Sequence, residues 1–388
     1  MVTNMNPLKT TRRLVVKVGS SLLVDADSGQ LRCDWLNSLV EDLAQLQSTG
    51  TNVALVSSGA IALGRRKLGL PPGALKLEES QAAAAAGQID LAAAYGGAFA
   101  QHKVPVAQIL LTLSDTEERR RYLNARNTLS ALFRVGAVPV INENDTVATE
   151  EIRFGDNDRL AARVAAMVSA DTLVLLSDID GLYDADPKQN SNARKVTLVK
   201  AISNDIECMA GNTGSDMASG GMVTKLAAAR IALDAGCALA IADGRRTNPI
   251  ATLATVNDGT WFIGEETPQQ ARKRWINGAL KVEGAVHIDA GAVKALHQGK
   301  SLLPAGTVKV IGAFERGATV KIIGPDDREI ARGLIAYEAN DARKIAGKQS
   351  AAIEAELGYR GRAALIHRDD LSLTGRSETQ LERKEASK

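Results

Sequence analysis

The sequence is poor in aromatic residues, in cysteine and in excess charge of either sign. Phe, Trp and Tyr together make up 3% of the 388 residues, so the chain offers few rings on which nucleic-acid bases could stack. The 47 lysines and arginines nearly balance the 45 aspartates and glutamates, and the net charge is +2. Because nucleic-acid-binding proteins carry a marked positive charge, any such role would depend on a local basic patch.

The chain also lacks the marks of a secreted or membrane-bound protein. Its three cysteines, Cys33, Cys208 and Cys237, are widely spaced and have no histidine nearby, which argues against a disulfide framework and against a zinc site. No apolar run approaches the roughly 20 residues that cross a bilayer, and residues 1–11 lack the apolar stretch of a signal peptide. We therefore expect a cytoplasmic protein.

The pattern between residues 12 and 265 is that of an α/β fold. Short β-branched runs alternate with longer helical stretches, and most of the short runs are apolar throughout, as in strands covered on both faces. We predict a three-layer αβα sandwich around a largely parallel open sheet. The expected strands are 14–18, 52–56, 105–111, 137–141, 172–176 and 238–242, and the expected helices are 33–49, 78–101, 116–135, 158–169 and 222–235.

The composition changes after Gly264, where a polar and basic stretch begins. Beyond it, short β-branched runs are separated by Gly and Asp turns, which predicts a small β-rich module. The end of the chain is charged and poor in apolar residues, which predicts disorder. The expected organisation is a large domain at 1–265, a linker at 266–277, a β-rich domain at 278–370 and a disordered tail at 371–388.

Polar and glycine residues follow several strands of the predicted sheet. Lys17 to Ser21 end the first strand and Ser57 to Ala60 end the second, while Asn142 to Asp145 follow the fourth and Gly155 to Asp158 open a helix. Ligands bind at the carboxyl ends of parallel strands, where glycine lets backbone amides approach an anion closely. Each loop alone is also compatible with an ordinary turn or helix cap.

A glycine-rich segment, Ser219 to Lys225, ends in a lysine at the start of a predicted helix. Glycines, a hydroxyl group and a lysine in this order suit a triphosphate, because backbone amides and one cation can bind its oxygens. The segment is not a Walker A motif, and the chain has no Gly-x-Gly-x-x-Gly sequence, which argues against a dinucleotide site.

These motifs together resemble the glutamate 5-kinase family of the amino acid kinase superfamily, over residues 12–370. The Asn-Glu-Asn-Asp sequence at 142–145 and the Gly-Asp-Asn-Asp sequence at 155–158 are the discriminating elements. The Gly-Leu-Tyr at 181–183 and the glycine-rich segment are shared more widely in the superfamily. Residues 278–370 resemble the PUA domain that is appended to the bacterial enzymes.

The resemblance implies ATP-dependent phosphorylation of the γ-carboxylate of L-glutamate, the first step of L-proline biosynthesis, with ATP and Mg²⁺ as cofactors. It assigns Lys17, Lys225 and Asp158 to catalysis, Lys17, Ser58, Asp145 and Asn157 to substrate binding, and Ser177, Asp178, Ser219, Gly220, Gly221, Met222, Val223, Thr224 and Lys225 to nucleotide binding. No residue is assigned to a metal.

The chemistry of this reaction agrees with the residues. A carboxylate is already nucleophilic at neutral pH, so no general base is required, and catalysis consists of positioning and electrostatic stabilisation. The two lysines and Mg²⁺ would neutralise the charge of the transferring phosphoryl group. Because a lysine side chain is flexible, Asp158 is predicted to orient both ammonium groups.

Alternatives remain open at this point. The chain could be another carboxylate or carbamate kinase of the same superfamily. It could also bind RNA through the PUA-like module and the basic residues at 272–274 and 343–344, although a structural or oligomerisation role of that module is the simpler interpretation. The Ala-rich helix at 78–101 is compatible with a homo-oligomer, a dimer or tetramer, and the resemblance implies feedback inhibition by L-proline.

Overall fold

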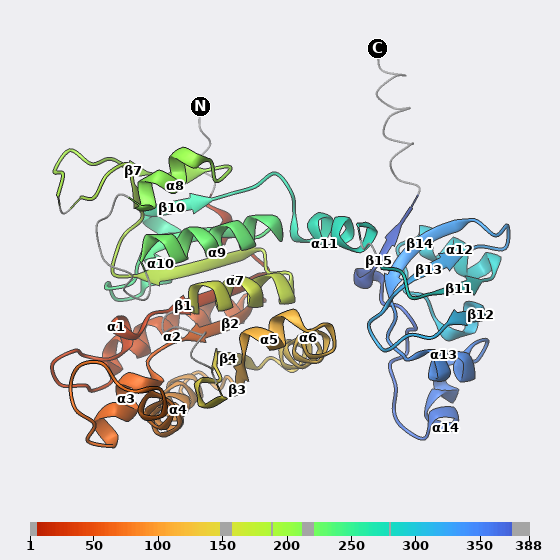
Figure 1. Ribbon diagram of the computed structural model, residues 1–388, viewed down its shortest axis with the longest axis horizontal. Coiled ribbons are helices and arrows are strands. Elements are labelled where there is room, and N and C mark those ends of the chain that lie inside the picture. Colours follow the sequence, from red (N-terminus) through yellow and green to blue (C-terminus); the bar gives the residue numbers. More distant parts are fainter. Residues whose placement is uncertain (1–5, 148–156, 188, 212–220, 279–280, 375–388) are drawn as a thin grey trace, which may run out of the picture. The chain divides into compact units, whose positions relative to one another are not determined.

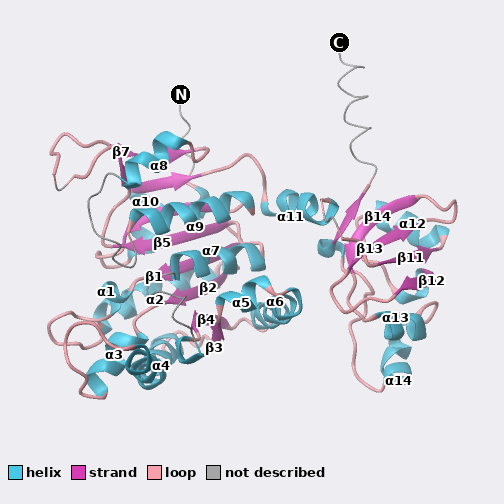
Figure 2. Cartoon of the chain, viewed as in Figure 1, coloured by secondary structure: helices cyan, strands magenta, loops and turns pink. Residues whose placement is uncertain are grey.

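The computed structural model describes residues 6–147, 157–187, 189–211, 221–278 and 281–374 of the chain. Figure 1 follows the chain from end to end, and Figure 2 distinguishes its helices from its strands. The chain divides into two units, Met1–Pro268 and Gln269–Lys388, each with a sheet of its own.

An eight-stranded sheet forms the centre of the first unit, in the order β3-β4-β2-β1-β5-β9-β10-β8. Neighbouring strands are parallel, except that β10 runs antiparallel to β9. The strands are β1 (Arg13–Val18), β2 (Asn52–Ser57), β3 (Val106–Leu111), β4 (Val138–Glu143), β5 (Thr172–Ser177), β8 (Leu198–Val199), β9 (Ala238–Asp243) and β10 (Gly259–Phe262). Two further short strands, β6 (Leu182–Tyr183) and β7 (Lys195–Val196), pair outside this sheet.

Helices cover both faces of the large sheet. Val15 and Val16 are neighbours on β1 and both are fully buried, but they belong to different cores. The core of Val16 lies under α2 (Cys33–Ser48), α4 (Leu77–Ala100) and α10 (Pro249–Val256). The core of Val15 lies under α6 (Arg119–Arg134), α7 (Asn157–Val168) and α9 (Met222–Asp234). Since successive side chains of a strand point to opposite faces, such strands are apolar throughout. The predicted three-layer sandwich with a largely parallel sheet is confirmed.

The helices of the first unit follow the predicted pattern, with additional short helices between the expected ones. They are α1 (Ser20–Leu23), α2 (Cys33–Ser48), α3 (Ala60–Lys67), α4 (Leu77–Ala100), α5 (Leu113–Glu117), α6 (Arg119–Arg134), α7 (Asn157–Val168), α8 (Asn204–Gly211), α9 (Met222–Asp234) and α10 (Pro249–Val256).

Helices α3 and α4 pack with their backbones in direct contact. A Cβ atom on Gly64 of α3 would lie 1.7 Å from the carbonyl oxygen of Ala83, and one on Gly87 of α4 would lie 1.9 Å from that of Ala60. Because only a residue without Cβ fits at either place, these two glycines set how closely the helices approach. The helix pair lies directly beyond β2, at the end of the strand where the candidate residues gather.

The second unit has a five-stranded sheet in the order β12-β11-β13-β14-β15. Its core contains Val286, Val320, Ile322 and Ile366, all fully buried. The strands are β11 (Gly284–Ile288), β12 (Thr307–Gly312), β13 (Thr319–Ile323), β14 (Glu329–Leu334) and β15 (Leu371–Leu373), and the helices are α12 (Ala290–His297), α13 (Ala339–Ile345) and α14 (Ile353–Leu357). The β-rich character predicted for this part of the chain is confirmed.

Two boundaries differ from the predicted organisation. The segment 266–277, predicted as a linker, contains helix α11 (Pro268–Asn277), and its Arg272 forms an ion pair with Asp370 at 2.5 Å, each side chain 9% exposed. Only Ala271 and Ile276 of this helix are buried, and most of its other residues are polar. This is why its sequence resembles that of a linker. The predicted tail at 371–388 begins too early, because β15 pairs with β14, and residues 375–388 lie outside the described residues.

No helix in the described part of the chain is both long and apolar enough to span a membrane. Cys33 and Cys208 are exposed and Cys237 is buried, and all three are free thiols. Burial raises the pKa of the Cys237 thiol, so this group stays protonated and unreactive.

Candidate active site

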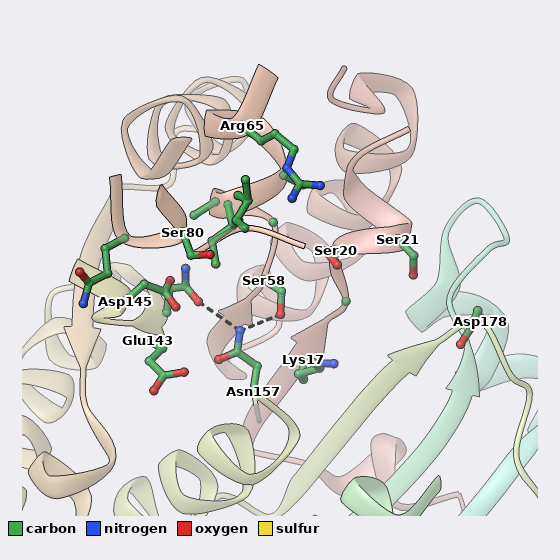
Figure 3. Close-up of a pocket in the computed structure, with 18 of the residues that line it drawn as sticks. Lys17, Ser20, Ser21, Ser58, Arg65, Ser80, Glu143, Asp145, Asn157 and Asp178 are labelled. Atoms are coloured by element: carbon green, nitrogen blue, oxygen red, sulfur yellow. Dashed lines mark hydrogen bonds between the residues drawn. The ribbon is translucent and has the colours of Figure 1, made fainter. Parts of the chain in front are cut away.

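A cavity of about 690 Å³ lies at the carboxyl edge of the large sheet (Figure 3). Strands β1, β2, β4 and β5 are parallel, so their carboxyl ends meet at one edge, and the residues that follow them line the cavity. Helices α3, α4, α7 and α9 also contribute to its wall. The predicted site residues that line it are Lys17, Ser58, Asp145, Asn157, Ser177, Asp178 and Lys225.

A buried carboxylate joins the two candidate lysines. Asp158 has no exposed surface; its Oδ1 lies 2.7 Å from Nζ of Lys17, and its Oδ2 accepts a hydrogen bond of 3.2 Å from Nζ of Lys225. Lys17 lies near the end of β1, Lys225 lies in the first turns of α9, and Asp158 lies in the first turn of α7. The sequence analysis predicted that Asp158 would orient both lysines, and the three side chains are in the predicted contact.

The charges within this cluster stabilise one another. Burial alone would raise the pKa of Asp158, but the ammonium groups of Lys17 and Lys225 and a hydrogen bond from Thr224 hold it below its usual value. Asp158 is therefore an anion at neutral pH. Lys17 is 8% exposed and Lys225 is 5% exposed, so each ammonium group lies in the wall of the cavity with part of its hydrogen-bonding capacity used by Asp158.

Asn157, next to Asp158 in the chain, connects the cavity to a buried chain of amides. Its Nδ2 donates to Oγ of Ser58 at 2.7 Å and to Oδ1 of Asn142 at 3.1 Å. Asn142 in turn donates to Oε1 of Gln88 on α4 at 2.8 Å. Oδ1 of Asn157 is buried and has no hydrogen-bond partner among the residues that the structure describes, which makes it an acceptor available to a ligand.

Asp145 is another carboxylate of the cavity wall, and its environment differs from that of Asp158. Burial raises its pKa to about 6, and no ion pair offsets that effect among the described residues. A half-buried carboxylate of this kind gains from a cationic ligand, because an opposite charge restores the stability of its ionised form. The arrangement of Asp145, Asn157 and Ser58 can therefore bind an ammonium group together with other polar atoms.

The predicted nucleotide-binding residues are only partly brought together. Ser177 and Asp178 end β5 and line the cavity, and Oγ of Ser177 donates to Oδ1 of Asp178 at 3.1 Å. Among the residues at the start of α9, Lys225 alone lines the cavity in the described structure, and Gly221, Met222, Val223 and Thr224 do not. Ser219 and Gly220 lie outside the described residues, as do Gly155 and Asp156.

The sequence analysis missed several polar residues of the cavity. Arg65 on α3 and Ser80 on α4 line it, and Asn142, although part of a recognised motif, was given no role. Gln88 lies behind the cavity wall through its bond to Asn142. Arg65, Ser80 and Gln88 reach the site only because α3 and α4 pack so closely. The sequence signals for this packing are Gly87, inside the predicted helix at 78–101, and Gly64, in a segment for which no helix was predicted.

The described residues include no group of three or more His, Cys, Asp and Glu side chains that could bind a metal ion. The carboxylates that line the cavity are Glu143, Asp145 and Asp178.

Comparison with known proteins gives matches over both units. Residues 12–243 match the amino acid kinase family, and residues 284–357 match the PUA domain. A glutamate 5-kinase from Paramagnetospirillum magneticum is 58% identical over 371 residues, which cover 96% of this chain and 100% of that protein. Glutamate 5-kinases from Rhizobium etli and Agrobacterium fabrum are 55% and 57% identical, over 100% and 95% of this chain and 100% and 95% of those proteins.

Proposed function

The chain belongs to the amino acid kinase family, and from this premise we propose that it transfers the γ-phosphoryl group of ATP to the γ-carboxylate of L-glutamate. The product is L-glutamyl 5-phosphate, and the reaction is the first step of L-proline biosynthesis. The relatives that match over nearly the whole chain are named glutamate 5-kinases.

The observation that carries this function is the contact of one buried carboxylate with two lysines. Lys17 and Lys225 come from β1 and α9, and both contact Asp158 at the sheet edge. Asp145, Asn157 and Ser58 line the cavity, as do Ser177 and Asp178 after the neighbouring strand β5, and in the view of Figure 3 Lys17 lies between Asn157 and Asp178. In such an arrangement, the fixed ammonium groups of Lys17 and Lys225 can hold two anions, the γ-carboxylate of L-glutamate and the γ-phosphate of ATP, one on either side.

The transfer requires no proton movement at the acceptor. An oxygen of the γ-carboxylate forms a bond to the γ-phosphorus of ATP, and the bond from that phosphorus to the β,γ-bridging oxygen breaks with its electron pair remaining on ADP. Charge on the transferring group is spread over its three equatorial oxygens. We propose that Lys17 and Lys225 stabilise this charge, with Asp158 holding both ammonium groups in place.

On the acceptor side, we propose that Asp145 and Oδ1 of Asn157 bind the ammonium group of L-glutamate and that the hydroxyl group of Ser58 donates to its reacting carboxylate. The raised pKa of Asp145 supports this assignment, as does Oδ1 of Asn157, a buried acceptor that has no partner among the described residues. Ser177, Asp178 and the segment Ser219 to Lys225 are proposed to bind ATP. The position of Ser177 and Asp178 at the end of β5, in the wall of the cavity, supports the assignment of these two residues to ATP binding.

Mg²⁺ belongs to this proposal as the counter-ion of ATP. It would neutralise part of the charge of the phosphates, and Asp178 and Glu143, which line the cavity, could contact it directly or through water. The protein residues named above bind and orient the two substrates irrespective of how many ligands the ion takes from the protein.

The function is tested by acceptor selectivity. The purified protein is incubated with ATP, Mg²⁺ and hydroxylamine, which traps an acyl phosphate as a hydroxamate, and ADP release is followed in parallel. L-Glutamate is expected to give the highest kcat/KM among L-glutamate, L-aspartate, N-acetyl-L-glutamate and carbamate. A higher kcat/KM with one of the other acceptors would assign the chain to a different kinase of the family.

Further proposals rest on the resemblance to the family and stay predictions. They are a division of the chain into a catalytic domain at about 1–265 and a PUA-like domain at about 278–370, assembly into a homo-oligomer, inhibition by L-proline and a cytoplasmic location. Repeating the hydroxamate assay with L-proline tests the inhibition, and light scattering on the purified protein tests the assembly.

A further inference from the structure

The cavity extends past the proposed glutamate-binding residues, between α3 and α4. Ile61 and Arg65 of α3, Leu75 of the connecting loop, and Leu77 and Ser80 of α4 form this part of its wall. Figure 3 shows Arg65 and Ser80 on one side of the cavity and Lys17 and Asn157 on the other, with Ser58 between them in this view. None of these α3 and α4 residues has a role in the function proposed above.

Two polar groups in this part of the wall have unused hydrogen-bonding capacity. The hydroxyl group of Ser80 is buried and has no partner among the described residues, and Ser80 is only 3% exposed. Nε of Arg65 is likewise buried and unpartnered within that part of the chain, while one of its terminal nitrogens donates to the carbonyl oxygen of Gly73. Because buried polar groups without partners are rare and costly, two of them in one cavity wall point to a ligand.

The charges of the cavity show what kind of ligand fits. Lys17, Lys225 and Arg65 are the cationic side chains among the described residues that line it. Lys17 and Lys225 both contact Asp158, whereas Arg65 forms no ion pair within the described part of the chain. A guanidinium group has five N–H donors in a planar fork that matches a carboxylate.

The acceptor has one group that the assignments above leave without a partner. L-Glutamate carries an ammonium group, the reacting γ-carboxylate and an α-carboxylate. Asp145, Asn157 and Ser58 account for the first two. We propose that Arg65 binds the α-carboxylate, with the hydroxyl group of Ser80 as a second donor, and that this pair selects acceptors with a second carboxylate. This inference rests on the function proposed above and names the part of the site that recognises the substrate.

The test compares acceptors that each lack one charged group. 4-Aminobutyrate is glutamate without its α-carboxylate, and glutarate is glutamate without its ammonium group. The wild-type protein is expected to prefer L-glutamate over 4-aminobutyrate by about 10²-fold in kcat/KM, the usual cost of losing one buried charged hydrogen-bonding partner. In Arg65→Met this preference collapses to less than about threefold, because activity with L-glutamate falls and activity with 4-aminobutyrate does not.

Arg66→Met is the matched control. Arg66 is the next residue of α3, is exposed and does not line the cavity, so this variant keeps the wild-type preference. Asp145→Asn shows the complementary pattern, since it loses activity with L-glutamate and 4-aminobutyrate but not with glutarate. For an acceptor that turns over too slowly, its dissociation constant measured by calorimetry replaces kcat/KM in each comparison.

Ser80→Ala separates ligand binding from folding. Removing a buried hydroxyl group that has no partner in the described part of the chain is expected to leave the midpoint of thermal unfolding unchanged or raised, while the KM for L-glutamate rises by up to about tenfold. A lowered midpoint with an unchanged KM would mean that Ser80 is purely structural. Equal losses of Arg65→Met with L-glutamate and 4-aminobutyrate would overturn the inference and leave the kinase function intact, whereas no activity of the wild type with L-glutamate would overturn the function itself.

Discussion

Nζ of Lys17 lies 2.7 Å from Oδ1 of Asp158, a carboxylate with no exposed surface. The other oxygen of the same carboxylate contacts Lys225. A lysine has four rotatable carbon bonds and would otherwise sample many positions, so the carboxylate converts two flexible cations into a fixed pair. Positioning of this kind reduces the reorganisation that phosphoryl transfer requires.

Asp158→Asn keeps the size of the side chain and removes its charge. We expect kcat to fall by about 10²- to 10³-fold, since the ammonium groups are no longer held, with a much smaller change in the KM for L-glutamate. Two buried lysines without a counter-charge also lower the free energy of unfolding, by about 3–5 kcal/mol. Steady-state kinetics and chemical denaturation measure the two effects.

The matched control for Asp158→Asn is Asp90→Asn, which breaks an ion pair with Lys67 whose two side chains are about half exposed. Exposed pairs contribute roughly 0–1 kcal/mol, so kinetics and stability should be close to wild type. Similar values of kcat for wild type and Asp158→Asn would contradict the positioning role.

Lys17→Ala and Lys225→Ala should each lower kcat far more than they weaken glutamate binding. Each removes a cation beside the transferring phosphoryl group, and we expect losses of about 10²- to 10³-fold in turnover. Lys67→Ala on α3, where the lysine is exposed, serves as the control and should retain activity. If both cavity variants kept near wild-type turnover in the hydroxamate assay, the two-lysine mechanism would be wrong.

Glutamate binding should weaken as the pH falls through about 6. Burial raises the pKa of Asp145 to about 6, so its carboxylate is ionised above that pH and protonated below it. The protonated group cannot pair with the substrate ammonium, and the KM for L-glutamate rises by up to tenfold for each pH unit below 6.

The raised pKa of Asp145 also makes the free energy of unfolding depend on pH, and here a lower pH is favourable. Because the pKa of Asp145 is higher in the folded protein than its usual 3.8, its ionisation destabilises the ligand-free protein as the pH rises between about 4 and 6. Asp145→Asn should have a high KM for L-glutamate that no longer depends on pH in this range. A wild-type KM that stays constant from pH 8 to pH 5 would remove Asp145 from the ammonium site.

Gly87→Ala should destabilise the first unit and reduce the affinity for L-glutamate together. The added Cβ would meet a backbone oxygen at 1.9 Å, so α3 and α4 must move apart, at a cost of about 3 kcal/mol or more. The shift displaces Arg65 and Ser80 from the cavity. Gly97→Ala on the same helix is the control, since its Cβ meets nothing within 4 Å, and alanine there should stabilise the helix by about 1 kcal/mol. Thermal unfolding and the KM for L-glutamate distinguish the two variants.

The central strands of the large sheet could be predicted from sequence because burial on both faces requires apolar residues throughout. Val53 to Val56 on β2 and Leu173 to Leu176 on β5 are examples, and all of them are buried. The short strands β8 and β10 could not be predicted in this way. Leu198 and Val199 form only two residues of strand, and β10 consists of Gly259, Thr260, Trp261 and Phe262, a sequence without a β-branched apolar run.

The residues of the candidate site also fall into those that could be predicted from the sequence and those that could not. Lys17 and Ser58 could be found because they lie at the ends of β1 and β2, two strands whose place in the sheet was predictable, and Asn157 and Asp158 could be found because they open α7, close to the start of the predicted helix at 158–169. Arg65, Ser80 and Gln88 could not, because they lie inside helices, and their position depends on the packing of α3 against α4. Such packing is set by contacts between residues distant in sequence, and Gly64 and Gly87 reveal it only after the two helices are placed together.

The ion pair between Arg272 and Asp370 has a practical consequence for dividing the chain. Thr267 still lies against Gly236 of the first unit, whereas Arg272 already belongs to the second, so the change from one unit to the other takes place within a few residues around Pro268. A second unit that began at residue 278 would lose Arg272 and with it the ion pair that this side chain forms with the buried carboxylate of Asp370, and α11 should therefore be kept with the residues that follow it.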